Sequence, residues 1–596
     1  MPLPHPMPAR HRPLRHRGAP APRGTAGPAR GLPSRVALPS KHHSPRTAQG
    51  ATVMVSRDPI GRRTLLTYGG AGLLLAACGP QPAARPVVRA TGRPRRGGSL
   101  VFATQGEAGG LDPAATLFDR SGHVYARAVF DRLAALDAQG RVRPYAARSI
   151  TPNREATRWT IELRPGMTFH DGEPFDAAAV KANFDAQRGH DFLGLLLGPI
   201  EATRVTAKDT LVVEMKEPWA AFDSYLTGYP GAQLGYVASP KTLGKGGDPR
   251  HPVGSGPFVF KEWQAGDHLT LTRNERYWRR GLPYLDQVAF RPIPDPLARE
   301  NAIRAGDIDA LHSQDAQTIA AFRGEPGFTL ADDLNTTFGQ KDITLVALNV
   351  SRPPVDDLRV RQALACATDA AKYSKVIDKG LAPVMDGLFQ RGSPYHARSP
   401  YPPHDVERAK RLIAEYERER GPLPPIKVTI QTTPRDITAF SLIQGMWRQA
   451  GIESAPVQVS KDNFGEVLLG GGYEAIIGAF FGAGDPDQNA LYFSSASAAP
   501  NGEPALNFTR NRDKAIDAAL AEGRRATGAS ARQAAYRALN ERLNTALPFV
   551  WLDATPYSLV TRPDVGGLLE PALPDGGREL GLLRGVVNVT SAWRAA

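Results

Sequence analysis

The sequence has very little cysteine and no cluster of metal-ligating residues. Only Cys78 and Cys366 occur among its 596 residues, so a disulfide framework is excluded and stability must come from burial. Cys366 lies in an apolar helical run and is interpreted as an inert core thiol. The eight histidines beyond residue 77 are scattered. We therefore expect no cofactor and no metal site built by the protein.

Catalytic motifs are also missing. The chain lacks Gly-x-Ser-x-Gly, His-Glu-x-x-His and a Walker loop. The pair His170-Asp171 could form a catalytic dyad, but no nucleophile motif accompanies it. It is interpreted as a turn whose side chains tie the backbone. We expect a protein that is not an enzyme, with a secreted hydrolase as a weaker alternative.

Acidic residues are scarce only at the amino-terminal end. Lys and Arg outnumber Asp and Glu by 12 to 1 in residues 1–77, which leaves 61 against 58 in the rest of a chain of net charge +14. A nearly neutral body offers no basic stripe, so no nucleic-acid partner is expected. Residues 1–53 are rich in Pro, Arg, His and Ala. They are predicted to be disordered, or an untranslated extension ahead of a true start at Met54.

No hydrophobic run near this end is long enough to span a bilayer. The apolar stretch 64–77 has fourteen residues, whereas a spanning helix needs about 20, so residues 54–77 are predicted to be a signal peptide. Arg62 and Arg63 resemble a twin-arginine signal, although their flanking residues leave a Sec route open. The tetrapeptide Leu-Ala-Ala-Cys ending at Cys78 resembles a lipobox. Acylated Cys78 would attach the chain to the membrane, with residues 78–98 as a tether.

Beyond residue 98, predicted strands and helices alternate to the end of the chain, which indicates an α/β fold. The strand expected at 99–103 leads into a polar loop that contains Gln105 and Glu107. A second expected strand, 473–477, precedes the loop 480–489. Loops at the carboxyl ends of buried strands are where open α/β sheets bind ligands, so both loops are candidates for a site.

Several sequence blocks, in the right order and spacing, resemble one family. They are Leu-Arg-Pro-Gly-Met-Thr-Phe-His-Asp-Gly-Glu-Pro-Phe at 163–175, Val-Gly-Ser-Gly-Pro-Phe at 253–258, Gly-Asp-Ile-Asp at 306–309 and Asp-Leu-Arg-Val-Arg-Gln-Ala-Leu at 357–364. Over roughly residues 98–596 the chain is similar to the extracytoplasmic solute-binding protein family 5. This group includes oligopeptide, dipeptide and nickel-chelate binding proteins.

The resemblance implies a two-lobed α/β fold of the periplasmic-binding-protein type II, with an extra subdomain and a ligand cleft between the lobes. Lobe I would comprise residues 99–311 and 555–596, and lobe II residues 312–554. The hinge would lie near Leu311-His312 and near Asp553-Ala554. In this family the lobes close over the ligand about such a hinge.

The resemblance also implies a function outside the cytoplasmic membrane. The chain would capture a small solute in the periplasm, or at the outer face of that membrane, and pass it to the permease and ATPase subunits of an ABC importer. We expect a monomer. A sensor on the same scaffold, which would report occupancy to a signalling partner, stays open as an alternative.

The loop 480–489 carries the prediction about the solute. In the peptide-binding branches an aspartate in this loop pairs with the peptide's α-ammonium group, but positions 480–484 hold no acid here. We therefore expect a solute without a free ammonium group, such as a sugar, an aromatic compound or a modified amino acid. Phe480 and Phe481 would stack on the ligand or pack in the core, Asp485 would bind the ligand or tie the loop, and Trp551 would face the cleft or be buried.

Overall fold

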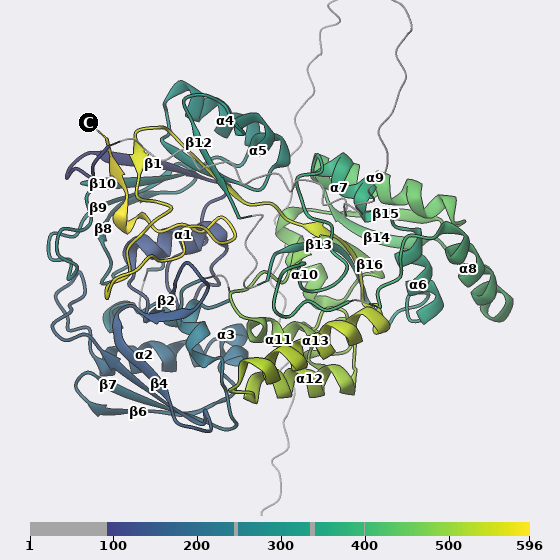
Figure 1. Cartoon of the computed structure of the whole chain (residues 1–596), viewed down its shortest axis with the longest axis horizontal. Coiled ribbons are helices and arrows are strands. Elements are labelled where there is room, and N and C mark those ends of the chain that lie inside the picture. Colours follow the sequence, from purple (N-terminus) through teal and green to yellow (C-terminus); the bar gives the residue numbers. More distant parts are fainter. Residues whose placement is uncertain (1–91, 230, 244–247, 334–339, 399, 596) are drawn as a thin grey trace, which may run out of the picture. The chain divides into compact units, whose positions relative to one another are not determined.

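The computed structural model describes residues 92–229, 231–243, 248–333, 340–398 and 400–595. All of them belong to one compact unit, which is drawn in colour in Figure 1. Within these described ranges, no helix is long and apolar enough to cross a membrane.

The predictions for the amino-terminal end lie outside the described residues. They are the extension 1–53, the signal peptide 54–77 with Arg62 and Arg63, Cys78, and most of the tether 78–98.

A seven-stranded mixed sheet forms the centre of the first lobe. Its strand order is β12-β18-β11-β1-β10-β9-β8. The central strand β1 pairs in parallel with both β10 and β11, and Phe102 on β1 is fully buried. The strands are β1 (Ser99–Thr104), β8 (Phe258–Gln264), β9 (His268–Arg273), β10 (Gln287–Pro292), β11 (Ala310–Ser313), β12 (Thr329–Asp332) and β18 (Ser558–Thr561).

Aspartates start the helices that follow three of these strands. Asp119, Asp295 and Asp315 each accept a hydrogen bond from a backbone N–H of the first turn, which satisfies a donor that the helix leaves free. The helices are α1 (Arg120–Val129), α4 (Pro296–Ala305) and α5 (Ala316–Phe322).

A smaller antiparallel sheet with its own core adds the extra subdomain to this lobe. Trp159, Phe184 and Trp219 are buried together in that core. The sheet has the order β4-β5-β7-β6, and a hairpin β2-β3 lies beside it in sequence. Its elements are β2 (Ala134–Leu136), β3 (Val142–Pro144), β4 (Ala147–Pro152), β5 (Arg158–Leu163), β6 (Ile200–Ala207), β7 (Thr210–Met215), α2 (Ala177–Arg188) and α3 (Asp191–Leu196).

The second lobe is built on a five-stranded sheet of order β15-β14-β16-β13-β17. Its strands are β13 (Ile343–Leu348), β14 (Ile426–Gln431), β15 (Ser454–Val459), β16 (Ala475–Phe480) and β17 (Phe549–Ala554). β13 is buried along its whole length because helices cover both faces of the sheet, so that the lobe has two apolar cores.

Eight α-helices of the described residues surround this sheet (Figure 1). They are α6 (Leu358–Ala367), α7 (Ala370–Ile377), α8 (Val406–Arg420), α9 (Pro434–Gln449), α10 (Lys461–Gly470), α11 (Ala490–Phe493), α12 (Lys514–Arg525) and α13 (Ala529–Ala546). Cys366 on α6 is a free thiol and is fully buried in the core.

Two segments connect the sheets. One joins β12 to β13, and its described residues are 333 and 340–342; the other joins β17 to β18 through residues 555–557. The second crossing lies next to Asp553-Ala554. The first crossing lies about twenty residues beyond Leu311-His312, the position that was predicted for the hinge. The reason is that β12, a strand of four residues, pairs with β18 and so returns the chain to the first sheet.

The carboxyl-terminal segment returns to the first lobe. Val586, Val587 and Val589 lie in the core that contains β1 and α1, and the short strands β19 (Val565–Gly566) and β20 (Trp593–Arg594) pair with each other. This segment, yellow in Figure 1, contains Arg584, whose Nε donates to Asp342 Oδ2 of the first crossing at 2.9 Å.

Candidate functional site

The loop after β16 is held in place by one of its own side chains, Asn489, and by Gln340 of the first crossing. Phe481 has a positive φ of 75°, which turns the chain away from the strand. Asn489 donates to the carbonyl of Phe481 at 2.6 Å and to Gln340 Oε1 at 2.6 Å. Gln340 and Ala483 exchange two backbone hydrogen bonds. The loop therefore has a defined conformation next to the first crossing.

Phe480 and Phe481 belong to an aromatic cluster within the second lobe. Phe481 is 4% exposed, and its ring centroid lies 4.8 Å from that of Phe493 and 5.1 Å from that of Phe549. Phe480 is half-buried and lies 5.0 Å from Phe508. These contacts favour core packing over ligand stacking, most clearly for Phe481.

Asp485 and Trp551 are also engaged within the second lobe. Asp485 accepts from the backbone N–H of Asp487 at 2.9 Å, which starts the 3-10 helix Pro486–Asn489, and from Arg532 Nη2 at 2.7 Å. The indole of Trp551 is 1% exposed and donates to Asn544 Oδ1 at 2.7 Å. Asp485 therefore stabilises the conformation of its own loop, and Trp551 is a buried core residue.

The two candidates after β1 lie apart from this loop. The backbone N–H of Gln105 donates to His312 Nε2 at 3.1 Å. The Glu107 carboxylate accepts from Trp263 Nε1 at 2.7 Å and from the N–H of Gly266 at 3.0 Å, so it fastens the β8-β9 hairpin. None of these contacts involves the loop 480–489.

A buried charge cluster at the crossings was not predicted from the sequence. Asp342 is fully buried just before β13, and three side chains converge on it. Arg120 Nη2 donates at 2.9 Å, Arg584 donates through Nε at 2.9 Å and Nη2 at 2.7 Å, and Tyr557 OH donates at 2.6 Å. The N–H of Gly482 adds a further bond of 2.9 Å. The cluster thus joins helix α1, both crossings, the loop after β16 and the carboxyl-terminal segment.

The two arginines control the ionisation of Asp342. Burial opposes the charged form, but Arg584 and Arg120 outweigh it and hold the pKa of this carboxyl below its usual range. Burial likewise keeps the pKa of Tyr557 well above its ordinary value, so its hydroxyl stays a donor. The side chain of Arg120 is 28% exposed, whereas that of Asp342 is 1% exposed.

A second set of contacts joins the lobes through the Asp-Pro-Asp segment. Asp487 Oδ2 accepts from Trp219 Nε1 at 2.7 Å and from Tyr225 OH at 3.1 Å, both of the first lobe. Gln488 Nε2 donates to the carbonyl of Ser224 at 3.0 Å. We call these five residues the interlobe contact. Asp487 is fully buried there and is also paired with Arg524 of its own lobe at 3.0 Å.

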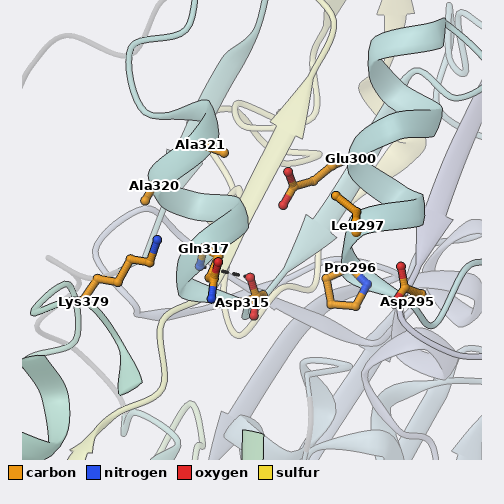
Figure 2. Close-up of a pocket in the computed structure, with 9 residues that line it drawn as sticks. All are labelled: Asp295, Pro296, Leu297, Glu300, Asp315, Gln317, Ala320, Ala321 and Lys379. Carbon is orange, nitrogen blue, oxygen red and sulfur yellow. Dashed lines mark hydrogen bonds between the residues drawn. The ribbon is translucent and has the colours of Figure 1, made fainter. Parts of the chain in front are cut away.

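A surface pocket lies away from these residues. It has a volume of about 590 Å³ and is lined by Asp295, Pro296, Leu297, Glu300, Asp315, Gln317, Ala320, Ala321 and Lys379. Figure 2 shows residues of α4 and α5 facing each other, with Lys379 entering from a separate segment. Asp295 and Asp315 are already used as helix caps, so this pocket offers no obvious ligand chemistry.

Two further predictions concern chemistry. The ring of His170 lies 3.0 Å from the carbonyl of Gly256, and Asp171 accepts from Ser239 Oγ at 2.7 Å, so both side chains fasten the turn to neighbouring segments.

In the described part of the chain, no group of three or more His, Cys, Asp or Glu side chains could hold a metal ion.

A comparison with known protein families identifies the family to which this chain belongs. The model of the bacterial extracellular solute-binding proteins, family 5 Middle, matches residues 141–502. The chain belongs to family 5. The family predicted from the sequence blocks is thereby confirmed, and with it a role as an extracellular solute-binding protein.

Curated relatives of this family 5 protein bind different solutes. It is 25% identical over 464 residues to the nickel-binding periplasmic protein of Escherichia coli K12, which covers 74% of this chain and 86% of the relative. It is 29% identical over 335 residues to the glutathione-binding protein GsiB of Salmonella typhimurium LT2, which covers 55% of this chain and 62% of the relative.

Solved structures confirm the two-lobed fold. NikZ from Campylobacter jejuni, in complex with nickel and L-histidine, matches with a TM-score of 0.69 at 21% identity, over 82% of this chain and 97% of NikZ. The oligopeptide-binding protein AppA from Bacillus subtilis, in complex with a nonapeptide, matches with a TM-score of 0.71 at 19% identity, over 85% of this chain and 100% of AppA.

Proposed function

We propose that this family 5 protein captures a small polar organic solute between its two lobes and delivers it to the permease and ATPase subunits of an ABC importer. Cys78, once acylated, would hold it at the outer face of the cytoplasmic membrane. The two crossings join the seven-stranded sheet to the five-stranded sheet, and the interlobe contact joins the extra subdomain of the first lobe to the second lobe at a different place. This arrangement supports a closing motion.

The charges of the loop 480–489 carry the inference about the solute. Its two carboxylates, Asp485 and Asp487, are paired with Arg532 and Arg524 and are therefore already neutralised. A buried ammonium group without a counter-charge costs several kcal/mol. This supports a solute that presents no free ammonium group to the loop.

The ligands of the relatives can be weighed against this requirement. Free peptides and glutathione carry an α-ammonium group, so they fit less well than a sugar, an aromatic acid or a metal chelate. A chelate would be recognised through its organic part, since the described residues offer no cluster of metal ligands. Arg120, whose side chain is 28% exposed, could then pair with a carboxylate of the solute.

A thermal-shift screen of the purified protein tests this proposal. The panel would contain di- and tripeptides, glutathione, sugars, aromatic acids and nickel chelates. A ligand at 100 times its dissociation constant adds about 2.7 kcal/mol of stability. We expect the largest shift from a compound without a free ammonium group. If dipeptides or glutathione gave the largest shifts, the inference from the loop charges would be wrong.

Membrane attachment is tested separately through Cys78. The wild-type chain and Cys78→Ser would be expressed in a bacterial host and fractionated. We expect the wild type with the membranes and the variant in the periplasmic extract, because two or more acyl chains are needed for stable attachment. Equal distribution of the two proteins would contradict lipidation at this residue.

A further inference from the structure

A second pocket lies between two turns of the first lobe, and its volume is about 480 Å³. One wall is the turn that joins β2 to β3, and the other is the turn between Ala572 and Arg578, which form an isolated bridge. Three arginines line the pocket. Arg141, Arg143 and Arg578 expose 62%, 46% and 59% of their side chains, so both walls present positive charge to the solvent.

Asp137 orients two of these arginines. Its Oδ1 accepts from the backbone N–H groups of Gln139 at 3.0 Å and Arg141 at 2.9 Å, which fixes the carboxylate within the turn. Its Oδ2 accepts from Nε of Arg141 at 2.8 Å and from Nε of Arg143 at 2.9 Å. Among the described residues, neither Nη of Arg143 has a hydrogen-bond partner. One carboxylate, only 7% exposed, thus holds two guanidinium groups next to each other and leaves donors of Arg143 unused.

The charges around this pocket do not balance. Besides the three arginines of the walls, Arg164 donates to Asp575 at 2.5 Å, and Arg279 donates to the carbonyl of Ala572 at 2.8 Å. The carboxylates that form ion pairs with these five arginines are Asp137, Asp575 and Glu570. Two positive charges are therefore in excess here, whereas the whole chain beyond residue 77 has an excess of only three.

The amino-terminal segment reaches the fold close to these arginines. The N–H of Gly97 donates to the carbonyl of Tyr284 at 2.8 Å, and that of Gly98 donates to Asp286 at 2.9 Å. Tyr284 is five residues from Arg279, and five residues of extended chain span at most about 18 Å. The predicted tether, residues 78–98, therefore joins the first lobe near this pocket.

We propose that this pocket binds the phosphate group of an anionic phospholipid, so that this face of the first lobe lies against the membrane. Guanidinium groups match the oxygen geometry of phosphate, and the excess charge attracts an anionic surface. The pocket is formed by the first lobe alone, so a solute bound there would not be enclosed between the lobes. The inference rests on the proposed function, since acylation of Cys78 is what would bring the protein to the membrane.

Vesicle sedimentation tests this proposal with the full chain that carries Cys78→Ser, so that no acyl chain contributes. The vesicles would contain phosphatidylcholine alone or an equal mixture with phosphatidylglycerol. The double variant Arg143→Gln and Arg578→Gln removes two charges and leaves Arg141 on Asp137. The matched control is Arg411→Gln and Arg418→Gln, which removes two exposed arginines from α8 of the second lobe.

One arginine at an anionic membrane surface changes binding about fivefold. We expect the pocket variant to bind the anionic vesicles at least about fivefold more weakly than the parent, and the control variant to bind like the parent. The basic amino-terminal segment is the same in all three proteins. Neutral vesicles should bind none of them well. Arg578→Gln alone, whose partner Glu570 is 40% exposed, covers the case that the double variant fails to fold.

Three results would overturn the proposal. They are equal binding of the parent and the pocket variant, equal losses in the pocket and control variants, and calorimetric binding of inorganic phosphate without binding to anionic vesicles. The last result would assign the pocket to a free anion. Each of them leaves the attachment through Cys78 standing, because fractionation of the wild type and Cys78→Ser tests that attachment separately.

Discussion

Removal of the charge of Asp342 should destabilise the folded protein, because this carboxylate is buried between two arginines. Asp342→Asn keeps the shape of the side chain, but it leaves the two guanidinium groups of Arg120 and Arg584 without a counter-charge. The NH2 group of the new amide also faces the N–H and O–H groups that donate to Asp342. Loss of one partner of a buried ion pair costs about 3–5 kcal/mol.

The exposure of the two arginines places the expected loss at the lower end. Their side chains are 28% and 13% exposed, so water partly solvates the charges that are left behind. We expect Asp342→Asn to lower the free energy of unfolding by about 3 kcal/mol near neutral pH. Asp575→Asn, whose carboxylate pairs with Arg164 at 2.5 Å but is 62% exposed, is the control and should lose less than about 1 kcal/mol.

The pH dependence of this difference gives a second, independent check. The pKa of Asp342 is lower in the folded protein than its usual value, so its charge stabilises the fold above pH 4 and this contribution is lost as the pH falls. In urea denaturation followed by tryptophan fluorescence, the gap between the wild type and Asp342→Asn should be largest near pH 6 and shrink toward pH 3. A gap under about 1 kcal/mol, or one that does not change with pH, would refute the role assigned to the cluster.

Three other substitutions or treatments test the site description. Phe481→Ala should destabilise the protein by about 3–5 kcal/mol in the same denaturation assay, because it opens a cavity in the aromatic cluster, and a stability equal to the wild type would favour the ligand-stacking role instead. Trp219→Phe removes the indole donor to Asp487, and a hydrogen bond to a charged group is worth about 1.5–3 kcal/mol. Energy transfer between a donor and an acceptor fluorophore, one attached to each lobe, should therefore report more open lobes than in the wild type. Cys366 should resist a thiol reagent until denaturant is added, since it is buried and its pKa is raised by burial; rapid labelling of the native protein at this residue would contradict that placement.

Motifs and periodicity were sufficient for the architecture. The alternation of strands and helices predicted an α/β fold, and the blocks at 163–175 and 253–258 predicted the family that the family model confirms. Helix starts were also predictable, because an aspartate such as Asp357 satisfies free backbone donors locally and needs no distant partner. Such features depend on residues close in the sequence.

The candidate site was less predictable for the opposite reason. Phe480 and Phe481 adjoin a family-like loop, and only packing against Phe493 and Phe549 indicates that they belong to a core. The boundary at Leu311-His312 was placed too early because β12 is a short strand whose membership in the first sheet depends on pairing with β18.

Sequence by itself determined the family, the fold class and the absence of an acid from positions 480–484. Tertiary structure alone decided which charges meet. Asp342 is separated from Arg120 by 222 residues and from Arg584 by 242, and Trp219 is separated from Asp487 by 268. No local pattern records these pairs, because a charge in a low-dielectric interior selects its partner by position in space and not by distance along the chain.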